Sequence, residues 1–278
     1  MAKKLSFALN HMTVATKRYD EVIAIASHLG CVGVEFRNDL PRALFDGDAP
    51  GAVKALAAES GVRILGLSEV KMFNDLSPER AVEARALMKI ARELGAESIS
   101  LIPRCDGEGC GNGERQANLR IALRQIVPML QEFGLTGLVE PLGFEHSSLR
   151  YKHEAMDVID GLNARGTLKL VHDTFHHHLA SETEFFAGDT GIVHVSGVAD
   201  PTVDVRDMQD NHRILVDASD RLGNVAQIRT LLADGYTGAV SYEAFSPLVH
   251  EYTDPIGQVS ASMTYVCDQL AAAGIEAK

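Results

Sequence analysis

Four ionisable residues in the second half of the chain each stand at the end of a short apolar run. They are Glu140, Asp173, His194 and Glu243. Three carboxylates and one imidazole offer hard oxygen and nitrogen ligands, which suit a divalent cation. Buried carboxylates are costly unless they are paired or bound to a metal, so the alternative is a buried ion-pair network. We interpret the four residues as ligands of one divalent metal ion. The ligand types do not select among Mn²⁺, Co²⁺, Mg²⁺ and Zn²⁺, and Mn²⁺ is our first expectation.

Further polar residues stand where they could contact a substrate. His176 follows the aspartate by about one helical turn, at the start of a run of three histidines. His212 and Arg213 lie in the long charged segment 207–224, and such polar loops are often functional. Lys71 follows the third apolar run closely. We expect these four residues to bind substrate.

Other polar residues at the ends of the runs keep two interpretations. They are either substrate contacts or ion-paired residues of the rim, and they are Arg37, Glu69 and Arg104. His177 and His178, which complete the histidine run, are assigned no role.

The elements that must position these residues alternate regularly along the chain. Short apolar runs predict strands at Leu5–Leu9, Val32–Phe36, Arg63–Leu67, Ser98–Ile102, Leu138–Glu140, Leu168–His172, Ile192–Val195 and Ala239–Tyr242. Amphipathic stretches between them predict helices at Tyr19–Leu29, Ala49–Ser60, Pro78–Leu94, Glu114–Phe133, Lys152–Leu162, Val225–Asp234 and Pro255–Ala273.

The runs are almost continuously apolar, which is typical of parallel strands covered on both faces. Eight such strands separated by helices predict an α/β fold, a (β/α)8 TIM barrel, with residues 1–278 as one domain. An open doubly wound sheet is the alternative. The first run is not followed by a G-x-G-x-x-G turn, and no change in composition marks a second domain, so we favour the barrel. In such barrels the chemistry lies at the carboxyl ends of the strands.

Composition limits the partners of the protein. The chain has 26 Lys and Arg against 38 Asp and Glu, a net charge of −12, which does not favour a phosphate-binding surface. No stretch is long and apolar enough to span a membrane, and the segment from Met1 to Leu9 is expected to form the first strand rather than a signal peptide. Four cysteines are too few for a disulfide scaffold. We expect a cytoplasmic protein with reduced thiols, a small-molecule substrate, and no nucleic-acid or membrane partner.

Several segments together resemble the xylose-isomerase-like TIM-barrel superfamily, and within it the 2-keto-myo-inositol (inosose) isomerases. The segments are 33-GVEFRNDLP-41, 65-LGLSEVKMFND-75, 139-VEPLGF-144, 170-LVHDTFHHH-178, 193-VHVSGVAD-200 and 240-VSYEAFSP-247. The resemblance implies the metal ligands Glu140, Asp173, His194 and Glu243, with His176 as the histidine of the D-x-F-H motif. Two departures are visible. Tyr242 replaces the usual valine, and the D-R motif finds only Asn211-His212-Arg213, without the P-G-x-G that usually follows.

The activity that this resemblance implies is a metal-dependent isomerisation of a cyclic polyol ketone. In it, 2-keto-myo-inositol becomes a 1-keto-chiro-inositol type of product through an enediolate. Glu140 and Glu243, from strands three apart, would act as the base and the acid. Three alternatives remain open: an inosose dehydratase, a ketohexose 3-epimerase and a non-enzymatic sugar-binding barrel. A homo-oligomer is also possible.

Overall fold

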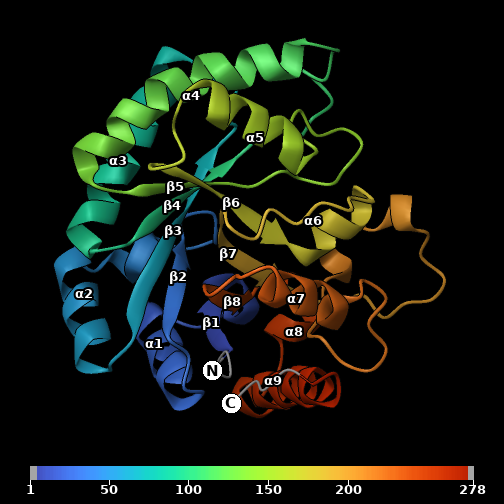
Figure 1. Cartoon of the computed structure of the whole chain (residues 1–278). Coiled ribbons are helices and arrows are strands. Elements are labelled where there is room, and N and C mark those ends of the chain that lie inside the picture. The colour runs from blue at the N-terminus through green and yellow to red at the C-terminus, as the bar shows by residue number, and fades with distance from the viewer. Residues whose placement is uncertain (1–4, 275–278) are drawn as a thin grey trace.

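Eight parallel strands close into a barrel in the computed structural model, which describes residues 5–274 (Figure 1). Each strand pairs with its neighbours in the sequence, and the last strand pairs with the first. The strands are β1 (Ser6–Asn10), β2 (Gly33–Arg37), β3 (Arg63–Lys71), β4 (Ser98–Ile102), β5 (Thr136–Val139), β6 (Leu168–Asp173), β7 (Thr190–Val195) and β8 (Ala239–Tyr242). The prediction of a (β/α)8 barrel is confirmed.

Two predictions reach beyond this range. Residues 1–4 and 275–278 lie outside the described residues. The expectation that residues 1–278 form one domain includes both ends, so it stays a prediction, as does the expectation for the start of the segment from Met1 to Leu9.

Helices surround the barrel and connect its strands (Figure 1). They are α1 (Tyr19–His28), α2 (Pro50–Glu59), α3 (Pro78–Leu94), α4 (Glu114–Phe133), α5 (Lys152–Gly161), α6 (Thr174–Leu179), α7 (Asn224–Ala233), α8 (Pro247–His250) and α9 (Pro255–Ala272). The seven predicted helices are present, with ends within one or two residues of the expected positions. The sequence pattern missed α6 and α8, because helices this short carry too few turns for a periodic signal.

The chain marks its own element boundaries with residues of special backbone preference. Ser77 accepts a hydrogen bond from the backbone N–H of Arg80 and caps the start of α3, with Pro78 in the first turn. Gly95 ends α3 with φ of 76°, and Gly134 ends α4 with φ of 67°. Glycine adopts this left-handed conformation without strain, so the chain can turn at once into the next strand.

The barrel interior is apolar toward the amino ends of the strands. Alternate residues of the strands point inward, and five of them form a buried cluster: Ala8, Leu65, Leu138, Val171 and Ile192. The outward-facing residues, such as Val193 and Val195 of β7, pack with the helices in the main core. The same alternation decides which residues reach the interior at the other end.

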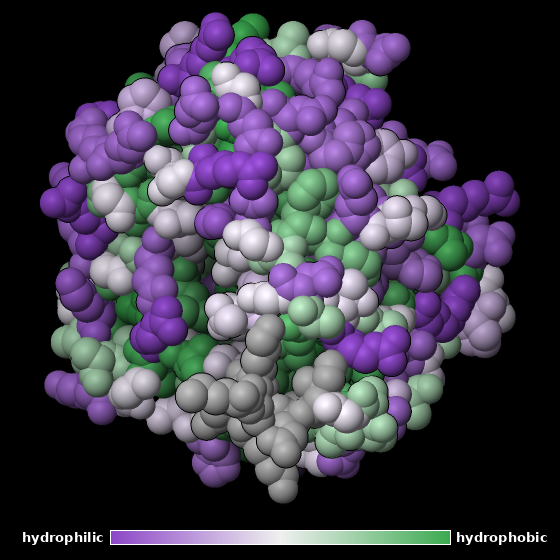
Figure 2. All heavy atoms as spheres, in the orientation of Figure 1, coloured by the Kyte–Doolittle hydropathy of each residue, from purple (hydrophilic) through white to green (hydrophobic). Residues whose placement is uncertain are grey.

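The surface is largely hydrophilic on the face seen in Figure 2, where polar side chains cover most of the periphery. Among residues 5–274, no helix combines the length and the apolar character that crossing a membrane requires.

Candidate metal centre

Four predicted ligands meet inside the carboxyl end of the barrel. One ligand atom from each lies within 4.8 Å of the others, and all four residues are buried: Glu140, Asp173, His194 and Glu243. Three of them stand two residues after an apolar residue of the inner cluster, namely Leu138, Val171 and Ile192. Since strand residues alternate between faces, this spacing of two places the charged side chains on the inner face.

The His194 imidazole shows the strongest sign of a ligand site. Its side chain is 1% exposed, and its Nε2 is paired with Glu35 Oε2 at 3.1 Å. Its Nδ1 lies 3.1 Å from Glu243 Oε2 and 3.7 Å from Glu140 Oε1. Within the described residues, this buried Nδ1 makes no hydrogen bond. A buried nitrogen without a hydrogen bond, facing two carboxylates, has the geometry of a metal ligand.

Glu35 of β2 fixes the orientation of this imidazole. The residue is fully buried, and its Oε1 accepts a hydrogen bond from Ser241 Oγ at 2.5 Å. The amide of Asn10 donates to the same oxygen at 3.5 Å. A carboxylate on the far nitrogen of a ligating histidine is a common arrangement around metals. Sequence analysis assigned Glu35 no role, although a charged residue within the apolar second run was a visible signal.

Glu243 is surrounded by hydrogen-bond donors. Its Oε1 accepts from Arg37 Nη1 at 2.6 Å and from Asn10 Nδ2 at 3.1 Å, and its Oε2 accepts from Arg213 Nη2 at 3.1 Å. Burial by itself raises the pKa of Glu243. His194 and the two guanidinium groups outweigh burial and hold that pKa well below its usual range. Glu243 is therefore held as an anion.

Glu140 has a contrasting environment. Burial raises the pKa of Glu140 to about 7, against the opposing effect of His194. No guanidinium group is paired with this carboxylate among residues 5–274. The two glutamates that sequence analysis treated as equivalent therefore differ in their partners.

Asp173 joins the barrel to α6. Its Oδ1 accepts hydrogen bonds from the backbone N–H groups of Phe175 at 2.7 Å and His176 at 3.2 Å, which caps the helix. Its Oδ2 accepts from Arg213 Nη2 at 2.6 Å. One carboxylate thus starts a helix and takes part in the site.

Arg213 is buried against the ligand carboxylates. Its Nη2 contacts both Asp173 and Glu243, and its Nε donates to Ser196 Oγ at 2.9 Å. The guanidinium carbon lies 5.0 Å from the ring centre of Phe175 and 4.4 Å from that of Phe245. Stacking between two rings suits the planar guanidinium group and fixes its position.

The backbone next to Arg213 explains why it is buried. Gly197 and Ile214 exchange two backbone hydrogen bonds of 2.7 and 2.8 Å, which draw the charged loop back onto the end of β7. A Cβ on Gly197 would stand 2.9 Å from the carbonyl oxygen of Leu215. Glycine permits this close approach.

The other predicted substrate residues divide into two groups. His176 is buried beside Phe144 and Phe175, and its Nδ1 has no hydrogen-bond partner among the described residues. His212 instead accepts a hydrogen bond at Nδ1 from the backbone of Gln209 in its own loop. Lys71 is exposed at the end of β3. The structure brings His176 and Arg213 to the site but connects neither His212 nor Lys71 to the four ligands.

The three residues with two interpretations, substrate contact or ion-paired rim residue, have different environments in the structure. Arg37 reaches the centre through Glu243 and is held by two hydrogen bonds to Asp39. Arg104 is an ion-paired residue of the rim, bound to Asp75 and Asp106. Glu69 lies 3.7 Å from Arg37.

The donor set fits a divalent cation. Three carboxylates and the Nδ1 atom of His194 converge in a buried space, and Glu35 occupies the other imidazole nitrogen. This buried cluster could therefore bind a metal ion.

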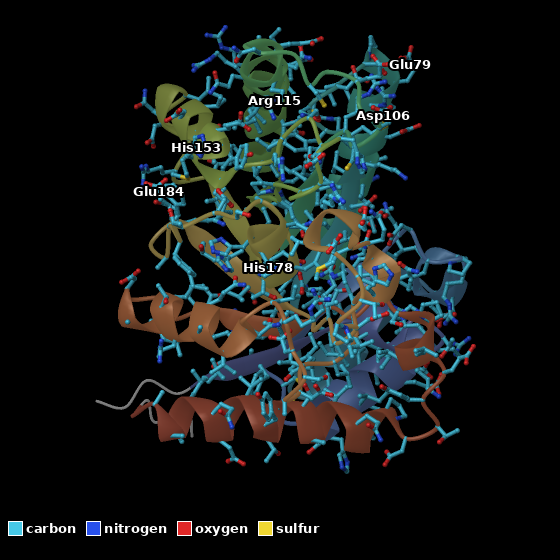
Figure 3. The ribbon with its side chains drawn as sticks, turned by 90° about the vertical axis from the view of Figure 1, so that its right-hand side faces the viewer. Glu79, Asp106, Arg115, His153, His178 and Glu184 are labelled. Atoms are coloured by element: carbon cyan, nitrogen blue, oxygen red, sulfur yellow. The ribbon has the colours of Figure 1, made fainter. Side chains whose placement is uncertain are left out.

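A second buried polar cluster lies behind α6. Lys152 Nζ contacts His177 Nδ1 at 2.7 Å and Glu182 Oε2 at 2.6 Å. The rings of His172 and His177 lie 4.7 Å apart. We call Lys152, His172, His177 and Glu182 the lysine cluster. Figure 3 shows His153 and Glu184 at the surface on this side of the molecule.

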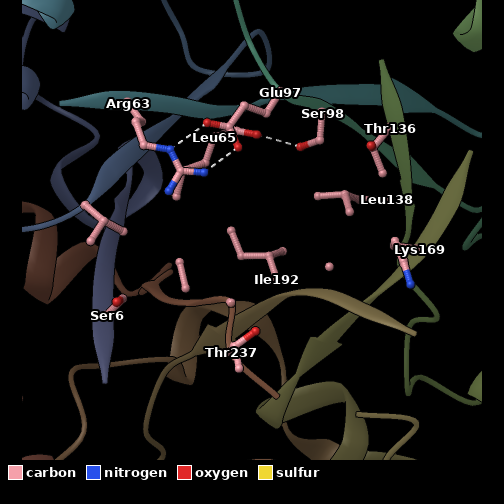
Figure 4. A pocket seen from close by; sticks show the side chains of 14 residues that line it. Ser6, Arg63, Leu65, Glu97, Ser98, Thr136, Leu138, Lys169, Ile192 and Thr237 are labelled. Atoms are coloured by element: carbon pink, nitrogen blue, oxygen red, sulfur yellow. Dashed lines mark hydrogen bonds and ion pairs between the residues drawn. The ribbon is translucent and has the colours of Figure 1, made fainter. Parts of the chain in front are cut away.

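A hollow at the opposite end of the barrel is separate from this chemistry. It has a volume of about 340 Å³ and lies at the amino ends of the strands, with Leu65, Leu138 and Ile192 among its lining residues (Figure 4). Its charged residues Arg63 and Glu97 are paired with each other at 2.6 and 2.7 Å. The amino-terminal face of such barrels serves stability rather than catalysis.

Comparison with solved structures supports the fold over almost the whole chain. A xylose isomerase domain containing protein from Salmonella typhimurium is 28% identical, with a TM-score of 0.89 over 96% of this chain and 98% of that one. The IOLI protein with a bound zinc atom is 16% identical, with a TM-score of 0.84 over 94% and 98%. D-Psicose 3-epimerase from Clostridium cellulolyticum is also 16% identical, with a TM-score of 0.71 over 96% and 99%.

Sequence comparison identifies the family. No curated protein sequence matches the chain significantly. Residues 23–269, however, match the family described as xylose isomerase-like TIM barrel. This match includes all four ligand positions and seven of the eight strands. The chain belongs to the xylose isomerase-like TIM barrel family.

Proposed function

We propose that this protein is a divalent-metal-dependent isomerase of a cyclic polyol ketone, with 2-keto-myo-inositol as the substrate and a 1-keto-chiro-inositol type of product. The observation that carries the proposal is the convergence of three carboxylates on the buried Nδ1 of His194, which makes no hydrogen bond among the described residues. The metal is proposed to be Mn²⁺, held by Glu140, Asp173, His194 and Glu243. The likeness to the IOLI protein with its zinc atom supports a metal, and Zn²⁺, Co²⁺ and Mg²⁺ are the alternatives.

The chemistry requires a proton to move between neighbouring carbons. A bound divalent cation would polarise the ketone and stabilise negative charge on its oxygen. Glu140 is proposed to take the proton from the carbon that bears the hydroxyl group and to return it to the former ketone carbon. Glu243, with donors from Arg37, Arg213 and Asn10, is better suited to remain an anion. This assignment differs from the expectation that Glu140 and Glu243 act as the base and the acid.

Substrate hydroxyl groups need polar partners that face the same space. His176 has a buried Nδ1 that makes no hydrogen bond within residues 5–274, and Arg213 is held between two aromatic rings. We assign substrate contact to these two residues. His212 and Lys71 have no such support, and their roles as substrate contacts rest on the sequence alone.

A ketohexose 3-epimerase is the second candidate. D-Psicose 3-epimerase and L-ribulose 3-epimerase are among the solved structures with the same fold. An epimerase would return the proton to the carbon that lost it, on the other face, so the same four ligands serve both reactions.

Proton NMR in D2O separates these reactions. The protein, loaded with Mg²⁺ to avoid paramagnetic broadening, is incubated with 2-keto-myo-inositol, and EDTA-treated protein serves as the control. A new keto-inositol is the expected result. Loss of water would identify a dehydratase. Bound metal without any reaction, with Mn²⁺ also tested, would contradict the inositol assignment and lead to a test of ketohexoses.

A further inference from the structure

Glu69 is a carboxylate at the barrel mouth that no part of the ligand set uses. It lies on β3, its side chain is 11% exposed, and the nearest cationic atom is Arg37 Nη2 at 3.7 Å from its Oε2. Among residues 5–274, no donor makes a hydrogen bond to its carboxylate. Because no protein donor holds its oxygens, this carboxylate is available to a bound molecule.

Arg37 makes a longer ion pair with Glu69, because its hydrogen bonds go to other carboxylates. The guanidinium donates to both oxygens of Asp39, at 2.8 and 2.7 Å, and to Glu243 at 2.6 Å. The same guanidinium group therefore contacts the ligand Glu243 with one nitrogen and approaches Glu69 with another. One guanidinium group thus links the Glu69 carboxylate to the cluster of predicted ligands.

Burial brings the pKa of Glu69 close to neutral pH. Burial raises the pKa of Glu69 to about 7, with Asp39 and Glu140 acting in the same direction and with Arg37 and Lys71 opposing. A group that titrates near the working pH can both give and accept a proton.

The proposed isomerisation needs a second proton-transfer group besides Glu140. Moving hydrogen from one carbon to the next does not complete the reaction, since the ketone oxygen must also gain a proton and the neighbouring hydroxyl must lose one. Glu243 is held as an anion by its donors. The proton transfer between the two substrate oxygens is therefore not assigned to Glu140 or to Glu243.

We propose that Glu69 transfers the proton between the two substrate oxygens in the isomerisation. The inference rests on the proposed function. In the first step Glu140 takes the carbon-bound proton, the C–H electron pair forms the carbon–carbon double bond, and the ketone oxygen takes a proton from the Glu69 acid. In the second step the hydroxyl group returns a proton to the Glu69 carboxylate. Its oxygen forms the new carbonyl, and the proton on Glu140 passes to the former ketone carbon. Both glutamates end as they began, and no oxidant is needed.

Glu69 also has a connection to solvent. It borders a hollow of about 520 Å³ between β3 and α3, whose lining includes Asn38, Lys71 and Glu83. A proton-transfer group in this position can exchange its proton with water between turnovers.

The test compares Glu69→Gln with Glu83→Gln, which removes a carboxylate from the same hollow but from α3. Each protein is loaded with Mg²⁺ and incubated with 2-keto-myo-inositol in D2O. Proton NMR follows two rates in one sample, the formation of product and the exchange of the carbon-bound hydrogen next to the ketone. Titration calorimetry with MnCl2 measures metal affinity separately.

We expect Glu69→Gln to slow product formation by about 100-fold or more while hydrogen exchange by Glu140 falls much less. Metal affinity should equal that of the wild type, Glu69→Asp should recover part of the rate, and Glu83→Gln should behave as wild type. Product formation within about threefold of wild type in Glu69→Gln would overturn the inference alone. A parallel loss of both rates together with metal affinity would also overturn it, by indicating a structural role. No turnover by the wild type would refute the proposed function and this inference with it.

Discussion

Two buried polar clusters lie against opposite faces of β6, and they differ in their balance of charge. Asp173 points into the barrel, toward the three other predicted ligands. The adjacent His172 points outward, toward His177 of the lysine cluster. Burial acts to lower the pKa of both His194 and His177. Around His194, the carboxylates of Glu243 and Glu35 outweigh burial, so the pKa of His194 is raised overall. In the lysine cluster Lys152 acts with burial and lowers the pKa of His177 to about 3.

This difference shows which kind of buried polar cluster is suited to bind a metal ion. In the lysine cluster one ammonium group bridges an imidazole nitrogen and a carboxylate, so Lys152, His177 and Glu182 satisfy each other. The buried Nδ1 of His172 also makes no hydrogen bond among residues 5–274, but no carboxylate there is paired with it. In the cluster of predicted ligands, His194 Nδ1 faces the carboxylates of Glu140 and Glu243 and makes no hydrogen bond among the described residues. The arrangement in the lysine cluster stabilises the fold. The arrangement around His194 is suited to binding a cation from solution.

The largest expected effect comes from Glu140→Gln. This change removes a metal ligand and the proposed proton carrier, so we expect activity to fall by about 10⁴-fold. The fold should remain, because one of several crowded carboxylates becomes neutral. Activity is measured by NMR with 2-keto-myo-inositol, and the fold by circular dichroism. A variant with full rate and full metal affinity would contradict both roles.

Breaking the lysine cluster should affect stability instead. Among the described residues, Lys152→Met leaves the Glu182 carboxylate with one hydrogen-bond donor, the backbone N–H of residue 152. We expect the free energy of unfolding to fall by about 3–5 kcal/mol. Urea denaturation measures this loss. Lys89→Met is a matched control on the exposed side of α3, where the loss should stay within about 0.5 kcal/mol.

A double variant sharpens this test. Adding Glu182→Gln to Lys152→Met removes the unpaired charge, so part of the lost stability should return. Equal losses in the single and double variants would mean that the ion pair is not the source of the effect.

The orientation of His194 gives the next effect. Glu35→Gln keeps the shape of the side chain but weakens the hold on Nε2, and we expect affinity for Mn²⁺ to fall by about 10–100-fold. Calorimetry with MnCl2 measures this affinity, and Glu97→Gln, on the opposite end of the barrel, is the control. Unchanged affinity would show that the fold positions the imidazole without Glu35.

The smallest effect, when measured over a single pH unit, is a pH dependence of stability from the lysine cluster. His177 has a pKa of about 3 in the folded protein, whereas a free histidine has a pKa of about 6.5. Between these values the unfolded chain binds more protons. The free energy of unfolding should therefore fall as the pH decreases from about 6.5 toward 3, by about 1.4 kcal/mol per pH unit from this group. Above this range the contribution is fully present.

His177→Gln isolates this contribution, because glutamine keeps an acceptor for Lys152 and does not titrate. Urea denaturation at about pH 7, 6 and 5 should give a weaker dependence for the variant than for the wild type. Parallel curves would show that His177 does not couple folding to protons.

Local patterns in the sequence determined the barrel and the positions of the four predicted ligands. The alternation of apolar runs with amphipathic stretches identified all eight strands. The ligand positions followed because strand residues alternate faces, so a charge two residues after an inward apolar residue also points inward. Glu140 after Leu138 and His194 after Ile192 are both of this kind. Because side chains alternate along a strand, the spacing of two residues in the sequence predicts the face on which a side chain lies.

Only the tertiary structure decided what surrounds the ligands. The contacts of Glu35 with His194, of Arg37 with Glu243 and of Lys152 with Glu182 join residues that are far apart along the chain. These partners distinguish Glu140 from Glu243 and separate Arg213, which reaches the site, from His212, which does not. The sequence gives the type of each ionisable residue. Its partners depend on how strands and loops pack in space, and those partners decide its protonation and its role.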